Sequence, residues 1–145
     1  MILTDVENSY QVSIGEEKAI IRNNSEEKGY SIIESKGPLE AKGFCVLNNV
    51  YINTGMEKAF EARFLNRQSN LATVTGFKAL RVMKAESGPY YVILTLWDSA
   101  QDFHNWQESS QYQKTHKKRG TSSGLDREVV ARKHSFNVRF HIQNQ

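Results

Sequence analysis

Three side chains from separate parts of the chain have types that suit chemistry at a bound metal: Asn48, Trp106 and His116. A neutral imidazole can ligate a metal ion, and the lysines around His116 disfavour its protonation. The Asn48 carboxamide can donate a hydrogen bond, and the Trp106 indole offers a broad apolar surface. Each also has a plainer interpretation. Asn48 would then be bonded to neighbouring backbone, Trp106 would be a core residue, and His116 would be a solvated or capping histidine.

Asn48 belongs to a predicted strand. The run from Phe44 to Asn53 carries apolar side chains at both alternating parities, which is typical of a strand covered on both faces. Asn48 has the same parity as four apolar residues of this run, namely Phe44, Val46, Val50 and Ile52. A buried carboxamide in the middle of an apolar stripe needs a hydrogen-bond partner, from the protein or from a ligand.

Trp106 and His116 belong to a predicted helical region, residues 99–119, made of two pieces. Capping-box patterns mark the start of both pieces, the first at Ser99. Tyr112 precedes His116 by about one helical turn, so the two side chains share a face. Basic residues and a following glycine mark the end of the second piece. We therefore expect His116 near a helix end.

A helix is also predicted from the capping pattern at Thr54 to about residue 70. Phe64 belongs to its apolar stripe, whereas Arg63 and Arg67 lie one turn apart on a face rotated from that stripe. Two arginines in this arrangement can anchor an anion, or they can belong to a solvated helix face. Both interpretations remain open at this point.

The elements that must position these residues follow the order strand, helix, strand, strand, helix, strand. Besides the elements above, strands are predicted over 77–83, 90–97 and 135–142. The βαββαβ order is that of the ferredoxin-like fold, an α+β architecture in which an antiparallel sheet carries its helices on one face. We predict such a domain over residues 44–145.

The other face of this sheet needs a cover, and residues 1–43 can provide it. Three short strand-like runs, at 10–14, 18–22 and 30–34, form a predicted β-rich extension that packs on the main domain. The fold would then resemble a dimeric α+β barrel built within one chain, as a monomer with an intramolecular pseudo-dimer. A homodimer whose sheets face each other is the alternative.

Composition restricts the function classes. The 145 residues have a formal net charge of +3 with basic and acidic residues interspersed, which argues against nucleic-acid binding. The single cysteine, Cys45, excludes an internal disulfide framework and favours a reducing cytoplasm. No segment has the roughly 20 apolar residues that cross a bilayer, so no membrane partner is expected. The other histidines, at 104, 134 and 141, are interpreted as surface residues.

Taken together, these segments resemble the IsdG- and HmoB-type haem-degrading monooxygenases of the antibiotic-biosynthesis monooxygenase superfamily. The likeness extends from Phe44 to the C-terminus. Trp106 and His116 are separated as the tryptophan and histidine of that family are. The segments that carry the likeness are FCVLNNV at 44–50, RFLNRQ at 63–68, LTLW at 94–97, NW at 105–106 and YQKTHKKRG at 112–120. The longer HmoB-type subgroup, which has extra N-terminal sequence, is the most similar.

The resemblance implies a haem oxygenase with haem as both substrate and prosthetic group. His116 would be the axial iron ligand, Asn48 would hydrogen-bond near the distal oxygen site, and Trp106 would buckle the macrocycle. A further set would contact haem: Arg63, Phe64, Arg67 and Tyr112, with the arginines holding the propionates. Dioxygen and electrons would open the ring, releasing iron and a linear tetrapyrrole. No flavin or nicotinamide motif occurs, so an external reductase or small-molecule reductant would donate the electrons.

Two alternatives remain. A cofactor-independent monooxygenase of the same superfamily would act on a polyphenolic substrate and would not need His116 as a ligand. A non-catalytic haem-binding or regulatory protein would need the histidine and a slot. The presence of both Asn48 and Trp106 favours turnover.

Overall fold

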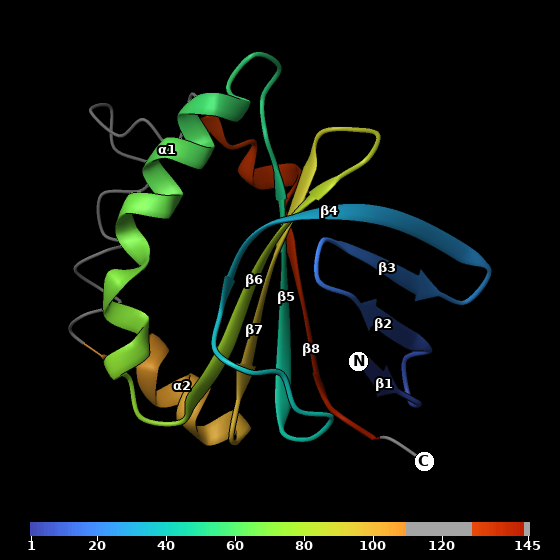
Figure 1. Ribbon diagram of the computed structural model, residues 1–145, viewed down its shortest axis with the longest axis vertical. Helices are drawn as coiled ribbons and strands as arrows, with labels where there is room; N and C mark the ends of the chain where they lie inside the picture. The colour runs from blue at the N-terminus through green and yellow to red at the C-terminus, as the bar shows by residue number, and fades with distance from the viewer. Residues whose placement is uncertain (110–128, 144–145) are drawn as a thin grey trace.

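In the residues that the structure describes, the chain forms one eight-stranded antiparallel sheet with two α-helices (Figure 1). The computed structural model describes residues 1–109 and 129–143, and of residues 65–70 only the backbone. The strands are β1 (Ile2–Asp5), β2 (Tyr10–Ile14), β3 (Lys18–Asn23), β4 (Glu26–Lys36), β5 (Phe44–Tyr51), β6 (Phe77–Ala85), β7 (Tyr90–Trp97) and β8 (Phe136–His141). The α-helices are α1 (Glu57–Arg67) and α2 (Ala100–Gln107), and short 3-10 helices span Gln68–Thr73 and Arg132–His134.

The predicted α+β, ferredoxin-like fold is confirmed. From β5 onward the elements follow the order β5-α1-β6-β7-α2-β8, and the strands lie side by side as β6-β7-β5-β8. Every one of these neighbouring pairs is antiparallel. Figure 1 shows α1 and α2 on the same side of the sheet. The helices therefore leave the opposite face of β5–β8 for another layer.

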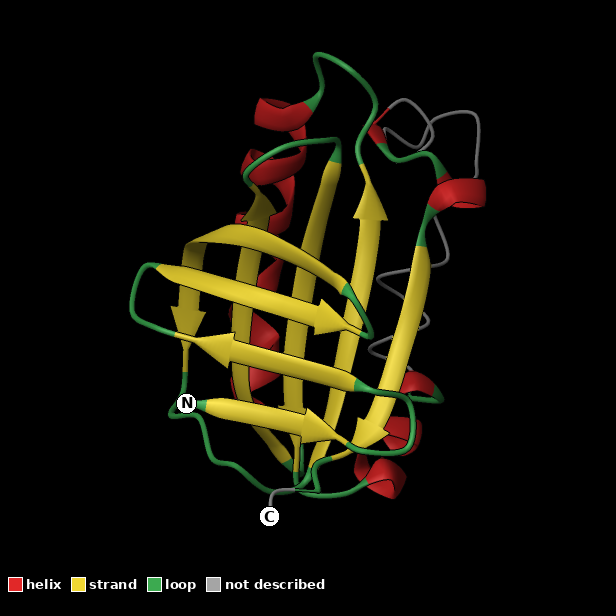
Figure 2. Cartoon of the chain, turned by 90° about the vertical axis from the view of Figure 1, so that its right-hand side faces the viewer, coloured by secondary structure: helices red, strands yellow, loops and turns green. Residues whose placement is uncertain are grey.

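The N-terminal strands cover that opposite face. β4 pairs with β6 through a register shift between Ile32 and Glu34, and β3, β2 and β1 continue the sheet from β4. In Figure 2 these strands cross in front of the remaining sheet. The chain nearly closes on itself, because the backbone N–H of Gln143 donates to the carbonyl oxygen of Thr4 at 2.8 Å. β1 is an additional strand that the sequence pattern did not predict.

β5 is buried on both faces, as its apolar run predicts. Cys45 and Leu47 point into the core that the N-terminal strands enclose, with Val12, Ile14 and Phe140 among its members. On the opposite side, Phe44 and Val46 pack beneath α2, and Val50 and Ile52 pack beneath α1. Asn48, which has the same parity as these four residues, is thus on the helix-facing side. The candidate site therefore belongs between the sheet and its helices.

Candidate functional site

Asn48 lies at the junction of two apolar clusters on the helix-facing side of the sheet. Two residues before it, buried Val46 belongs to the cluster beneath α2; two residues after it, buried Val50 belongs to the cluster beneath α1. Side chains two residues apart on a strand point to the same face. The carboxamide is therefore a polar group between two apolar surfaces that separate helices cover.

The Asn48 carboxamide has no hydrogen-bond partner among residues 1–109 and 129–143. Its cross-strand neighbours are Ile93 in β7 and Asn137 in β8, and Asn48 itself is only half-buried. Buried and half-buried amides in folded proteins are usually paired with protein or water. A donor that is unpaired within the described ranges can serve a ligand that lies between the sheet and the helices.

Trp106 completes an aromatic surface beneath α2. Its ring centroid lies 5.5 Å from that of Trp97 and 6.1 Å from that of Phe103. Trp97 is fully buried, and its indole nitrogen donates to the Thr95 hydroxyl at 3.0 Å, so the sheet holds this part of the surface rigidly. Trp106 itself is only half-buried. Together the three rings form a continuous aromatic surface between α2 and the sheet.

Local contacts explain why α2 takes this position. The predicted cap at Ser99 is confirmed, because the Ser99 hydroxyl oxygen accepts from the Asp102 backbone N–H at 3.1 Å. Gly76 precedes β6 with a φ of 83°, and a Cβ at that position would lie 2.3 Å from the Asp102 side chain. Only glycine lets the chain pass this close to the first turn of α2.

α1 is attached to the sheet by a buried tyrosine. The Tyr91 hydroxyl in β7 donates to the Glu61 carboxylate in α1, and the Lys84 ammonium lies 4.0 Å from the same carboxylate. Burial, with the bond to Glu61 as a further cause, raises the pKa of Tyr91 well above its usual value. The tyrosine ring packs on Phe60, with 4.8 Å between centroids. These contacts fix the side of α1 that faces the sheet.

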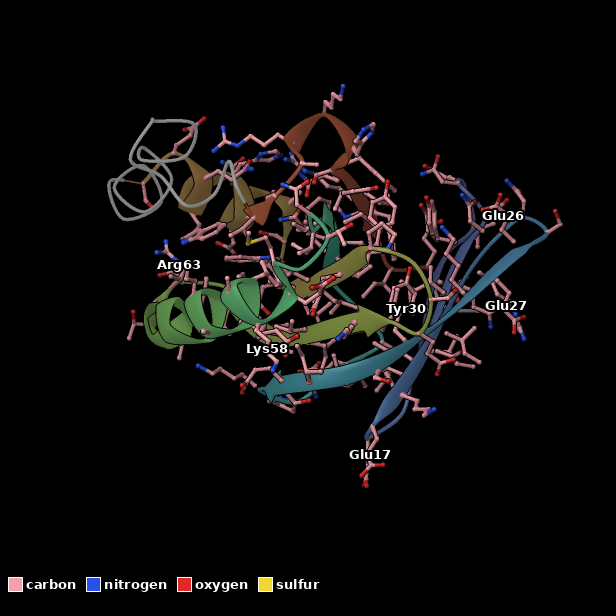
Figure 3. The ribbon with its side chains drawn as sticks, turned by 90° about the horizontal axis from the view of Figure 1, so that it is seen from above. Glu17, Glu26, Glu27, Tyr30, Lys58 and Arg63 are labelled. Carbon is pink, nitrogen blue, oxygen red and sulfur yellow. The ribbon has the colours of Figure 1, made fainter. Side chains whose placement is uncertain are left out.

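The remaining residues predicted on α1 are only partly placed. Phe64 stacks on Phe60 at 5.6 Å between centroids and packs against the cluster beneath α1. Arg63 is half-buried, and Figure 3 shows it on a different side of α1 from Lys58, which lies toward β4. Arg67 ends the helix, and its side chain lies outside the described residues.

Tyr112 and His116 lie outside the described residues, so the structure does not place the predicted iron ligand. Within the described ranges, no group of three His, Cys, Asp or Glu side chains is arranged to hold a metal ion. Likewise, none of the described helices is both long and apolar enough to span a membrane.

Sequence reasoning missed the side chains that β8 contributes to this face. Arg139 pairs with Val46 across the β5–β8 ladder, and His141 pairs with Phe44. Directly opposite residues in a ladder share a face, so both point to the side of the helices. The alternation of β8 shows which residues share a side, but only the register with β5 tells which side that is.

The comparisons with known proteins agree with this architecture. Residues 43–118 match the antibiotic biosynthesis monooxygenase family model, which is more than half of the chain. The chain therefore belongs to the antibiotic biosynthesis monooxygenase family, as the sequence resemblance predicted.

Individual relatives are distant. A heme-degrading monooxygenase of Listeria monocytogenes serovar 1/2a (strain ATCC BAA-679 / EGD-e) is 23% identical over 124 residues, which cover 83% of this chain and 71% of that protein. The crystal structure of a heme-degrading enzyme from Listeria monocytogenes superposes with a TM-score of 0.62 at 16% identity, over 97% of this chain and 87% of the other. A major regulator of staphylococcal pathogenesis has a TM-score of 0.68 at 12% identity, over 100% of this chain and 84% of the other. The structural matches show a shared fold.

Proposed function

We propose that this protein is a haem-degrading monooxygenase that opens the porphyrin with dioxygen and electrons from an external donor. The observation that carries the proposal is the carboxamide of Asn48, which has no hydrogen-bond partner among the side chains and backbone that the structure describes and lies between the two apolar clusters that α1 and α2 cover. A heme-degrading relative that covers most of the chain supports haem as the substrate.

The residues on the helix-facing side fit a haem substrate. An apolar macrocycle needs apolar and aromatic walls, which Val46, Trp97, Phe103 and half-buried Trp106 can provide. Asn48 is a polar group beside them, and its carboxamide, which has no partner in the described part of the chain, could donate a hydrogen bond to a bound ligand. Haem itself would supply the iron at which dioxygen is activated.

Each residue has a specific part in this proposal. The His116 imidazole would ligate the haem iron. The Asn48 carboxamide donates a hydrogen bond on the distal side. Trp106 would press on the macrocycle and distort it, and Phe64 and Tyr112 would contact the haem. Arg63 and Arg67 bind the propionates.

The N-terminal strands affect which oligomeric state we propose. We propose that residues 1–43 are an extension of a monooxygenase domain over residues 44–145. The pairing of β4 with β6 supports a monomer with an intramolecular pseudo-dimer, since the face that a second copy would cover is already occupied. A homodimer through another surface is the alternative.

We propose a cytoplasmic location, where the buried thiol of Cys45 stays reduced.

A haem-binding regulator is the second candidate, favoured by the structural match to a staphylococcal regulator. It would use the same face without turnover. The cofactor-independent monooxygenase is the third, and it would bind no haem.

One experiment separates the three. Purified protein is titrated with ferric haem, and its visible spectrum is followed in air with ascorbate, with catalase present to remove free peroxide. A Soret band that forms and then decays, with release of chelatable iron and a linear tetrapyrrole, supports the monooxygenase. A band that forms and persists supports the regulator, and the absence of a band contradicts haem as the substrate.

A further inference from the structure

Arg139 lies on the helix-facing side of the sheet next to the aromatic surface beneath α2. Its guanidinium carbon is 4.9 Å from the centroid of the Phe103 ring, a distance at which the cation and the ring attract each other. Its ladder partner is Val46, which belongs to the same cluster as Phe103. Two independent contacts therefore place this cation at the edge of the proposed haem site.

The position of β8 leaves the Arg139 head group open to a ligand. β8 is the last strand of the sheet, and in the described parts of the chain it pairs only with β5. Arg139 is exposed and forms no ion pair with any carboxylate of residues 1–109 or 129–143. Contact with the Phe103 ring face leaves the N–H donors at the guanidinium edge unused. The contact with Phe103 thus holds Arg139 in place, and none of the carboxylates that the structure describes neutralises its charge.

Arg139 is also at a suitable distance from Asn48. The two residues are diagonal neighbours on adjacent strands, which places them roughly 7–8 Å apart. A flat ligand with its centre near Asn48 and carboxylates on its rim would bring a carboxylate to Arg139. The planar guanidinium matches a carboxylate through two parallel hydrogen bonds.

We propose that Arg139 binds a carboxylate of the ligand, which is a haem propionate under the proposed function on which this inference rests. Arg139 is then a binding residue of the last strand, separate from the arginines of α1. His141, whose ring lies 5.1 Å from that of Phe44, borders the same carboxylate position and adds a second hydrogen-bond donor.

The test compares ferric protoporphyrin IX with its dimethyl ester, which keeps the macrocycle and iron but carries no carboxylate charge. Both are titrated by visible absorbance into the full-length protein, with the same low concentration of non-ionic detergent. The variants are Arg139→Gln and Arg139→Lys. Arg22→Gln is the matched control, because Arg22 lies on β3 and pairs with Glu27 at 2.6 Å, away from the helix-facing side.

The expected result is that Arg139→Gln raises the Kd of the diacid about fivefold, the size of a partly exposed ion pair, and leaves the Kd of the ester unchanged. Arg139→Lys should recover part of the loss, since it keeps the charge without the planar fork. The loss should shrink as salt is added. Arg22→Gln should bind both ligands as the unmodified protein does.

Two results would overturn this inference and leave the proposed function standing. Equal weakening for diacid and ester would mean that Arg139 acts only by packing on Phe103. Unchanged affinity for the diacid in Arg139→Gln, together with a loss in Arg63→Gln, would assign the carboxylates to α1. Failure of the unmodified protein to bind haem would instead overturn the proposed function, and this inference with it.

Discussion

The hydroxyl group of Tyr91 in β7 donates a hydrogen bond to the carboxylate of Glu61 in α1. The bond joins the sheet to the helix that carries Arg63, Phe64 and Arg67. Tyr91 is almost fully buried, so the bond lies within the interface between them. The position of α1 over the proposed site therefore depends on a polar contact as well as on apolar packing.

Replacing Tyr91 by Phe tests this contact. The variant loses the bond and keeps the ring that packs on Phe60. We expect the free energy of unfolding to fall by about 1–3 kcal/mol, since the bond is made to a charged group. Denaturant unfolding at neutral pH measures the difference. Tyr90→Phe is a control, because the Tyr90 hydroxyl donates to the His134 carbonyl at the surface and its loss should cost less.

The same pair predicts a pH dependence. The pKa of Tyr91 is raised in the folded protein, so above the ordinary tyrosine pKa of 10 the unfolded chain loses this proton first. The contribution of Tyr91 is complete below about pH 10 and falls as the pH rises further. We expect the stability difference between the unmodified protein and Tyr91→Phe to shrink from pH 9 to pH 11. A constant difference over this range would contradict the raised pKa.

Much of the fold could be predicted from the sequence because its signals are local. The alternation in β8, the two-sided apolar run of β5 and the Ser99 cap each depend on neighbouring residues, and the structure agrees with them. β1 could not be predicted from its own four residues, since its place depends on pairing with β2 and on the burial of Leu3 in the core. The helix-facing direction of Arg139 depends on register with a strand about 90 residues away, which local patterns do not contain.

The candidate site, like the fold, could be predicted from the sequence only in part. The parity of Asn48 was sufficient to place it on one face together with Val46 and Val50. Only the tertiary structure shows that the helices cover this face. The part taken by His116 stays a prediction, because it rests on the resemblance alone.

Asn48→Ala should slow haem degradation without destabilising the protein. The carboxamide has no partner in the described parts of the chain, so its removal leaves no described donor or acceptor unpaired. We expect a thermal midpoint within about 1–2 °C of the unmodified protein, as for other near-neutral changes. Loss of a donor that acts on developing charge should lower the rate by roughly 100-fold. Single-turnover decay of the Soret band measures this rate. A large drop in thermal midpoint would show that Asn48 is structural.

His116→Ala should abolish productive haem ligation. The axial ligand sets the visible spectrum of ferric haem, so the variant should lack the Soret position of the unmodified complex and should not release iron under ascorbate. His104→Ala is the matched control, because His104 is an exposed histidine of α2. If His116→Ala degrades haem at the normal rate, the ligand assignment is wrong.

Gly76→Ala should displace α2 and with it Trp106. The backbone at Gly76 has a φ of 83°, and the added Cβ would lie 2.3 Å from the Asp102 side chain in the first turn of α2. Gly88 provides a control for the backbone alone, since it has a φ of 92° and open space around the position of a Cβ. Each alanine costs about 1 kcal/mol for its positive φ, and the clash at residue 76 should add a further ~1–2 kcal/mol. Denaturant unfolding of both variants measures these costs.

Haem affinity should fall in Gly76→Ala and stay normal in Gly88→Ala, because only the first variant moves the aromatic surface that Trp106 forms with Trp97 and Phe103. Equal effects of the two substitutions would mean that the close approach of Gly76 to Asp102 does not position α2.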